Sequence, residues 1–333
     1  MKTIFNLTTS PDDLNRFANQ GELLSMLDGF DGLELMCFED DVGGIIPEER
    51  VIGLHMSSFP YWLDFWNGDE AGLLKEFGSL SQCQRYYGGS DKNALLCRFR
   101  QDLVNAQRYG AEYVVFHVSN ASIEETFTRQ YRHSDEEVIS ATCELLNDLF
   151  PDKDGPLLLL LENLWHPGLT LTKPEATRSL LKGVHYKNTG IMLDTGHLLH
   201  MNTALRSQKE GLAYIHSMLD AHGDLCGNIR GIHLNQSLTG QYSENMMKAP
   251  PVLKASYVER SCQAFLHAFA VDKHLPFTCE GVSDLIKRIA PQYLTFEFIT
   301  SNNAQHREYL KAQKVALQGM RDCLRSAYDK GAC

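Results

Sequence analysis

Six short apolar segments of the sequence each end in a histidine or an acidic residue. Imidazole and carboxylate groups are the protein ligands that Zn²⁺, Mn²⁺, Fe²⁺ and Co²⁺ accept. If these segments are strands whose ends meet, their last residues form a metal site. The residues, each with its segment, are His55 (VIGLH), His117 (YVVFH), Glu162 (LLLLLE), Asp194 (IMLD), His233 (IRGIH) and Glu297 (LTFE).

The number of these residues favours two metal ions over one. Three histidines and three carboxylates exceed what one ion can bind while keeping positions open for substrate. Two ions about 3.5–4 Å apart, bridged by one carboxylate, account for all six. Glu162 follows five consecutive leucines, so its carboxylate is expected to be buried and to need a cation nearby. The only Arg or Lys in the last five expected strands, Arg230, lies at the wrong end of its strand, so a metal ion is the expected partner.

The elements that must position these residues alternate between strands and helices. Short β-branched or apolar segments are separated, in most cases, by longer amphipathic stretches of helical period. Eight strands alternating with helices, without a long linker, predict an α/β fold, a (β/α)8 barrel. An open doubly wound sheet is the alternative, but no glycine-rich phosphate turn follows the first strand. The expected strands are residues 3–9, 32–38, 51–57, 112–119, 157–165, 189–197, 229–236 and 293–300.

Two expected helices carry clear end signals. Gly110 closes an amphipathic segment and is typical of a left-handed helix end. Ser134, followed by Asp-Glu-Glu, is typical of a capping box at a helix start. The expected helices are residues 93–110, 134–150, 173–183, 204–222, 257–271 and 306–330, and the tail 326–333 with Cys333 is expected to fray.

A long segment, residues 59–92, interrupts the alternation after the third strand. Segments of this length in compact domains are usually lids or binding elements. We therefore expect one domain over residues 1–333, with residues 59–92 as a lid over the carboxyl ends of the strands. Its aromatic residues Tyr61, Trp62, Phe65 and Trp66 either stack on a large flat ligand or pack together as a local hydrophobic cluster.

The composition excludes several classes of protein. The 333 residues carry 31 Lys and Arg against 42 Asp and Glu, a net charge of −11, which argues against a nucleic-acid partner. The longest wholly apolar run, residues 157–161, is too short to span a membrane, and the N-terminus lacks a signal-peptide core. Nine cysteines without a CxxC pair predict reduced thiols in a cytoplasmic protein. Association into an oligomer is compatible with the sequence.

Five motifs carry a resemblance to a known superfamily. They are DGLELMCF, LENLWH, LDTGHLLHMN, IRGIHLNQS and TFEF, at the second, fifth, sixth, seventh and eighth expected strands. With them the chain resembles the xylose-isomerase-like barrels over residues 2–300. That superfamily contains sugar isomerases and epimerases and also endonuclease IV, of AP endonuclease family 2. The motifs are specific for the superfamily and not for one reaction.

The resemblance implies one of two site designs. In the isomerase and epimerase branch, the residues matching Glu162, Asp194, His233 and Glu297 hold one ion, and the two glutamates move protons beside a carbonyl. In the endonuclease IV branch, the residues matching His55 and His117 hold a second ion, and the reaction is phosphoester hydrolysis.

The endonuclease branch has a third ion that this sequence does not clearly support. There, an Asp-x-His pair shortly after the seventh-strand motif holds the ion together with the residue matching His197. No such pair follows Ser237 closely here, and Glu244 is at best a partial substitute. His197 is then expected either to bind substrate or act as an acid, or to orient another ligand.

The preferred prediction is a hydrolase that uses two divalent ions (Zn, Mn, Fe or Co) on a small-molecule phosphoester. Glu162, Glu297 and His197 are the expected catalytic residues. By family analogy alone, the nucleotide loop of a cobamide is a candidate substrate. A one-metal sugar (phosphate) isomerase or epimerase, with Glu162 and Glu297 as the acid–base pair, is the alternative, and a ligand-binding barrel without activity is a third. The expected substrate-binding residues are Asn163, Trp165, His166, Asn235, Gln236, Tyr61, Trp62 and Lys248.

Overall fold

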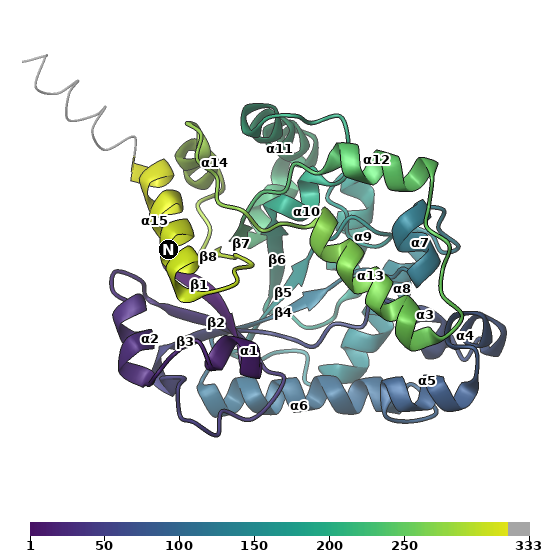
Figure 1. Ribbon diagram of the computed structural model, residues 1–333. Helices are drawn as coiled ribbons and strands as arrows, with labels where there is room; N and C mark the ends of the chain where they lie inside the picture. Colours follow the sequence, from purple (N-terminus) through teal and green to yellow (C-terminus); the bar gives the residue numbers. More distant parts are fainter. Residues whose placement is uncertain (319–333) are drawn as a thin grey trace, which may run out of the picture.

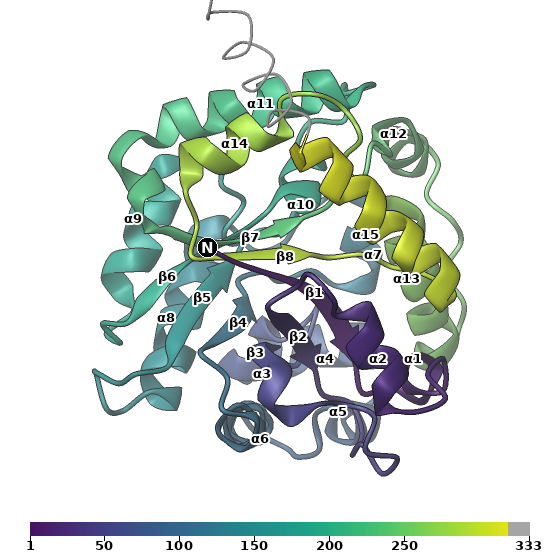
Figure 2. The ribbon, with the colours of Figure 1, turned by 90° about the vertical axis from the view of Figure 1, so that its left-hand side faces the viewer.

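Eight parallel strands close into a barrel in the order in which they occur along the chain. The computed structural model describes residues 1–318, and β1 pairs with both β2 and β8. Figure 2 shows helices surrounding these strands. The predicted (β/α)8 barrel in a single domain is therefore confirmed. The strands are β1 (Lys2–Thr8), β2 (Gly32–Met36), β3 (Val51–His55), β4 (Tyr113–His117), β5 (Leu158–Glu162), β6 (Thr189–Asp194), β7 (Ile229–Leu234) and β8 (Tyr293–Phe296).

The strands end sooner than the sequence patterns predict. Four of them, β3 to β6, stop at the histidine or carboxylate that ends the apolar segment. At β6 the chain leaves the sheet because a helix begins directly after the strand. Asp194 caps this helix by accepting a hydrogen bond from the His197 backbone N–H at 2.6 Å. The candidate ligands therefore lie at the rim of the barrel.

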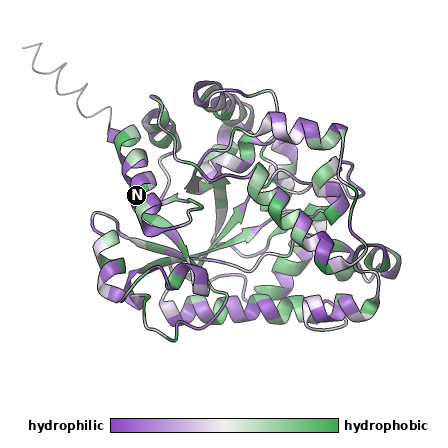
Figure 3. Ribbon diagram, viewed as in Figure 1, coloured by the Kyte–Doolittle hydropathy of each residue, from purple (hydrophilic) through white to green (hydrophobic). Residues whose placement is uncertain are grey.

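The inside of the barrel is packed with side chains. Figure 3 shows the central strands as largely hydrophobic, as expected for parallel strands buried on both faces. Tyr113 is fully buried at the centre, and its ring lies so close to Gly53 that a Cβ there would be 2.1 Å from the Tyr113 Cζ. The interior cluster consists of Ile4, Ile52, Tyr113, Val115, Leu158, Leu160, Met192 and Tyr293.

The helices follow the predicted pattern with small shifts at their ends. The capping box of Ser134 and Glu137 is present, and Gly110 has the left-handed conformation with φ 64°. Within residues 1–318, no helix is both long and apolar enough to cross a bilayer. The helices are α1 (Pro11–Leu14), α2 (Gln20–Met26), η1 (Glu48–Arg50), α3 (Leu63–Asn67), α4 (Glu70–Phe77), α5 (Leu80–Tyr87), α6 (Asn93–Tyr109), α7 (Ile123–Thr128), α8 (Asp135–Leu149), α9 (Pro174–Gly183), α10 (Thr195–Leu199), α11 (Gln208–His222), η2 (Gly223–Asn228), α12 (Gly240–Lys248), α13 (Tyr257–Val271), α14 (Val282–Ile289) and α15 (Asn303–Gln318).

The insertion 59–92 is largely helical and not an open loop. It forms α3, α4 and α5, which lie at the same side of the barrel as α13 in Figure 1. Its rings pack on one another: Phe65 stacks on Tyr87 with ring centroids 3.9 Å apart, and Tyr61 and Trp66 are buried. Of the two roles expected for these aromatic residues, the local hydrophobic cluster describes Tyr61, Phe65 and Trp66. The role of residues 59–92 as a lid stays a prediction.

A second excursion follows β7 and contains α12 and α13, which pack beside α7 (Figure 1). The chain returns to the barrel rim where Gln236 pairs with Leu275 through two backbone hydrogen bonds of 2.8 and 3.0 Å. Residues far apart in sequence are thereby joined at the mouth of the barrel. The last expected helix begins at Asn303, and the part of that prediction beyond Gln318, with the tail and Cys333, lies outside the described residues.

Candidate metal centre

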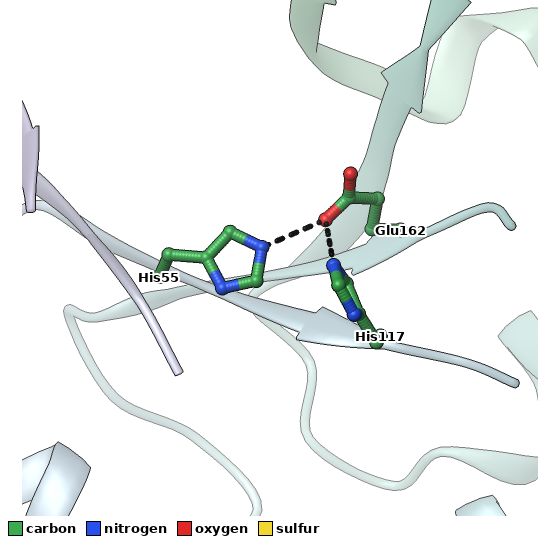
Figure 4. A group of neighbouring side chains, drawn as sticks. All are labelled: His55, His117 and Glu162. Atoms are coloured by element: carbon green, nitrogen blue, oxygen red, sulfur yellow. Dashed lines mark hydrogen bonds and ion pairs between the residues drawn. The ribbon is translucent and has the colours of Figure 1, made fainter. Parts of the chain in front are cut away.

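Two histidines point at one oxygen of Glu162. The Nε2 atoms of His55 and His117 each lie 3.1 Å from Glu162 Oε2 (Figure 4). The three residues end the adjacent strands β3, β4 and β5, and His117 is the register partner of Glu162. Neighbouring parallel strands thus bring two imidazoles and one carboxylate into a single group.

The other oxygen of Glu162 belongs to a second group. His233 Nδ1 lies 2.9 Å from Glu162 Oε1 and 3.4 Å from Glu297 Oε2. One ligand atom from each of Glu162, Asp194, His233 and Glu297 lies within 4.8 Å of the others. All six rim residues predicted from the sequence are therefore together, and Glu162 is the member that both groups share.

A third group corrects the expectation about the Asp-x-His pair. Asp272 and His274 form such a pair, and the Gln236–Leu275 pairing places it at the barrel mouth after the excursion of residues 238–271. His274 and His197 Nε2 lie 2.6 and 3.1 Å from Asp272 Oδ2, and ligand atoms of Asp194, His197 and His274 group together. A search of the sequence shortly after the seventh-strand motif misses the pair, because the pair is close to that strand in space but distant from it in sequence.

Glu244 does not substitute for this pair. It lies on α12, where its carboxylate is 3.7 Å from Arg206. His197 is fixed by the backbone carbonyl of Asn163, 2.9 Å from Nδ1, so that its Nε2 faces Asp272. This arrangement suits a ligand, while the predicted role of His197 in binding substrate or donating a proton stays a prediction.

Glu34 belongs to the site but is not among the residues predicted from the sequence. Its carboxylate lies 2.8 Å from His233 Nε2, and it accepts hydrogen bonds from the Tyr113 hydroxyl at 2.5 Å and from Thr295 Oγ1 at 3.1 Å. The available signal was a glutamate between Leu33 and Leu35 in a buried strand, where a charge needs a partner.

The residues fit divalent ions by the way their imidazoles are held. Metal-bound histidines usually give their second ring nitrogen to a carbonyl, hydroxyl or carboxylate, which fixes the ring. Here His55 Nδ1 lies 2.9 Å from the Met56 carbonyl and His117 Nδ1 lies 3.1 Å from Ser58 Oγ. In addition, His274 Nδ1 is buried without a hydrogen-bond partner among the described residues. The ring nitrogens that remain for a metal ion are Nε2 of His55, Nε2 of His117 and Nδ1 of His274, and they face the cluster.

The electrostatics of the cluster also favour cations. Although burial raises it, the charges of His233 and His117 hold the pKa of Glu162 well below its ordinary value. Burial raises the pKa of Glu297 to about 8, whereas the charge of Asp272, against the effect of burial, raises the pKa of His274 to about 9. Carboxylates and imidazoles that share protons in this way release them when a metal ion binds.

A cavity of about 230 Å³ opens beside the three groups. His55, His117 and Glu297 form part of its wall, and three predicted substrate-binding residues, Trp62, Trp165 and His166, also line it. Burial lowers the pKa of His166 to about 3, so this imidazole is neutral near pH 7. No Lys or Arg occurs among the described residues that line the cavity.

The other predicted substrate-binding residues are placed differently. Asn163 is joined to the backbone of Asp194 by two hydrogen bonds of 2.9 and 3.0 Å, and the Asn235 amide donates to Asp194 Oδ2 at 2.8 Å. The Gln236 side chain donates to the Pro276 carbonyl at 3.4 Å. These amides hold the site together from outside the cavity. Tyr61 bonds to Asp64 away from the cavity, and Lys248 is exposed at the end of α12.

A family model described as the xylose isomerase-like TIM barrel matches residues 71–317, about three quarters of the chain. The chain belongs to this family. The expected resemblance to xylose isomerase-like barrels is thereby confirmed, as is the prediction that the protein is an enzyme. No curated relative matches the chain.

Solved structures of this xylose isomerase-like fold resemble the chain over nearly its whole length. An IolI protein with a bound zinc atom shares 15% identity, with 96% of this chain and 97% of that chain covered and a TM-score of 0.52. The 3-keto-D-glucoside 4-epimerase YcjR from E. coli shares 13% (95% and 99% covered, TM-score 0.43). A Mycobacterium smegmatis barrel in complex with magnesium shares 16% (95% and 98%, TM-score 0.43). At 15% identity, the likeness to the IolI protein shows the fold alone.

Proposed function

We propose that the protein is a divalent-metal-dependent hydrolase of a small-molecule phosphoester, with Glu162 as the bridge between two ions. The observation that carries this proposal is the position of the Glu162 carboxylate. Its Oε2 faces His55 and His117, whereas its Oε1 faces His233 in the group with Asp194 and Glu297. A carboxylate whose two oxygens each face a different set of ligands suits a two-metal site.

The ligand sets assign a place to each ion. His55, His117 and Glu162 would hold one, and Glu162, Asp194, His233 and Glu297 the other, with Asp194, His197 and His274 available for a third beside Asp272. When bound, such ions polarise a phosphoryl oxygen and lower the pKa of water. No Lys or Arg occurs among the described residues of the cavity wall, so the metal centre would have to balance the negative charge of the substrate.

The protein groups supply orientation and proton transfer. Asn235 holds Asp194 by its amide and also lies 3.3 Å from Glu297 Oε2, which holds the two carboxylates in position. Glu297 lines the cavity, where its carboxylate would exchange a proton with the substrate. His197, fixed by the Asn163 carbonyl, lines the cavity and in a two-ion site would bind substrate or act as an acid.

Metal content and turnover together test this proposal. We expect at least two ions per chain by elemental analysis, located by anomalous scattering, and hydrolysis of methyl p-nitrophenyl phosphate that stops in Glu162→Gln. His55→Ala should lose one ion and at least about 100-fold of the activity. His222→Ala, a buried histidine that contacts Thr177 far from the cluster, is the matched control. One ion per chain with a fully active His55→Ala would disprove the proposal.

A one-metal isomerase or epimerase is the second candidate. The comparisons fit it at least as well as hydrolysis, since YcjR is described as an epimerase. Here the group of Glu162, Asp194, His233 and Glu297 would hold the ion, and the two glutamates would exchange protons with the substrate. Turnover of ketoses, with one ion and no dependence on His55, would select this candidate. No turnover of either class, with Glu162→Gln unchanged in ligand binding, would leave a binding protein.

A cobamide substrate stays a proposal with a geometric condition. The cavity of about 230 Å³ is smaller than the ~300–1,000 Å³ of clefts that enclose drug-sized ligands. A cobamide could therefore place only its nucleotide loop at the metal centre, while the corrin ring stays outside.

Two further proposals rest on the composition. The net charge of −11 favours a small-molecule partner over nucleic acid, and the cysteine pattern favours a cytoplasmic location.

A further inference from the structure

The cavity is lined by two kinds of side chain. Some belong to the metal-binding groups, including His55, His117 and Glu297. The others, here called the aromatic arm, are Phe59, Trp62, Phe99, Phe116 and Trp165. We infer that the aromatic arm is a subsite for a flat apolar ring of the substrate, held next to the phosphoryl group. This inference rests on the proposed function and names its substrate class.

The walls of the aromatic arm are held in place by their own packing. Phe99 contacts Phe59 and Phe116 edge-to-face, with ring centroids 5.8 and 5.1 Å apart. The Trp62 indole N–H donates to the Ser119 carbonyl at 2.8 Å, so its one polar atom already has a partner. Trp165 packs against His197 at 5.0 Å. A preformed wall of this kind binds a ring without ordering loose side chains.

Phe59 and Trp165 offer the surface that a ligand can cover. Both are only partly buried, whereas Trp62, Phe99 and Phe116 are buried. Phe59 comes from the segment after β3 and Trp165 from the segment after β5, so two separate parts of the chain supply these rings to the cavity. Aromatic surfaces favour another ring, which can pack against them face-on or edge-on.

Polar substituents would lose hydrogen bonds in the aromatic arm. The hydroxyls of Ser57 and Ser58 at its border are already engaged, the first with Asp102 at 3.1 Å and the second with His117 Nδ1 at 3.1 Å. A sugar hydroxyl or a charged group placed here would lack partners, and burial without partners is costly. The arm therefore selects an apolar ring, while the phosphoryl group stays at the metal-binding groups.

Binding of three phosphodiesters to the metal-loaded protein tests the subsite. The probes are dimethyl phosphate, methyl phenyl phosphate and methyl cyclohexyl phosphate, which share one negative charge and differ in one substituent. By isothermal titration calorimetry we expect methyl phenyl phosphate to bind at least tenfold more tightly than dimethyl phosphate, with cyclohexyl in between. Equal affinity of the phenyl and methyl compounds, or tighter binding of the cyclohexyl compound, would overturn the inference.

Variants of the arm provide the second measurement. Phe59→Leu and Trp165→Leu should reduce the phenyl-to-methyl affinity ratio to about threefold or less. Phe38→Leu, at an exposed residue that does not line the cavity, should keep the wild-type ratio. Unchanged metal content and circular dichroism show that each variant is folded. A wild-type ratio in both arm variants would contradict the subsite.

The outcomes separate this inference from the proposed function. If methyl p-nitrophenyl phosphate is hydrolysed but the three diesters bind alike, hydrolysis stands and the ring subsite fails. If the phenyl compound binds preferentially but no phosphoester is turned over, the subsite stands and the hydrolase proposal fails. If none of the diesters binds the metal-loaded protein, both are rejected.

Discussion

Glu34 and Glu162 lie on opposite sides of one imidazole. The carboxylate of Glu34 is 2.8 Å from His233 Nε2, and Oε1 of Glu162 is 2.9 Å from His233 Nδ1. In this arrangement Nε2 of His233 contacts Glu34, and Nδ1 faces the centre of the cluster. Glu34 thus sets which nitrogen of His233 is available to an ion.

Glu34→Gln should weaken metal binding. Loss of the charge that fixes His233 is expected to lower affinity by about 10- to 100-fold for the ion in the group with Asp194 and Glu297. Competition with a chromogenic chelator measures this affinity directly. Tyr113→Phe, which removes only one hydrogen bond to Glu34, should have a smaller effect. An unchanged affinity in Glu34→Gln would show that His233 is held by its packing alone.

Asp272→Asn should remove the third ligand group without disturbing the first. Asp272 lies within 3.2 Å of ring nitrogens of His197, His200 and His274, so loss of its charge leaves these imidazoles without a common acceptor. Elemental analysis should show one ion fewer than in the wild-type protein if a third ion binds there. The group of His55, His117 and Glu162 should keep its ion, and loss of every ion would contradict this independence.

Acid should destabilise the protein through His306, which is remote from the cluster. Burial, together with the charges of Arg16 and Arg307, lowers the pKa of His306 to about 3. Both ring nitrogens are buried without hydrogen-bond partners among the described residues. Between about pH 6.5 and 3, only the unfolded chain protonates this imidazole, so stability falls as the pH falls, by up to about 1.4 kcal/mol per pH unit.

His306→Phe tests this pH dependence. Phenylalanine keeps the edge-to-face contact with Phe5, whose ring centroid is 5.1 Å from that of His306. The free energy of unfolding, measured by urea denaturation at pH 7, 6 and 5, should decline less steeply in the variant than in the wild-type protein. His185→Phe, at an exposed histidine, is the comparison. Parallel declines in His306→Phe and the wild-type protein would exclude His306 as the source.

Gly53→Ala should destabilise the barrel from inside. An added Cβ would lie 2.1 Å from the Tyr113 ring, in an interior with no free space to receive it. We expect a loss of about 1–3 kcal/mol in the free energy of unfolding. Gly227→Ala, where nothing lies within 4 Å of the added carbon, is the control and should change stability little. Equal stability of the two variants would show that Tyr113 can move aside.

The sequence was sufficient to predict the barrel and the six rim residues, for one physical reason. Parallel strands buried on both faces appear as continuous apolar runs, and the first polar residue after each run marks the rim. This rule locates His55 and Glu162 equally well. It misses Glu34, which lies within its strand, and Asp272 and His274, which follow a helix and not a strand.

Side-chain direction was the other limit. Asn163 and Asn235 follow ligands in sequence and were expected to face substrate, yet their amides bond to the backbone and carboxylate of Asp194. An amide can serve either partner, and only the fold decides between them. For the same reason the sequence could not show that Trp62 would line the cavity while Tyr61, its neighbour, would not.

The pairing of Gln236 with Leu275 has a consequence for how this barrel can change over time. The pairing fixes both ends of the excursion that carries α12 and α13, and it holds Asp272 and His274 at the barrel. Mutations that lengthen, shorten or rebuild the segment with α12 and α13 can therefore leave the positions of Asp272 and His274 unchanged. This part of the molecule is therefore where descendants of one ancestral enzyme can acquire new external partners while the chemistry inside is inherited intact.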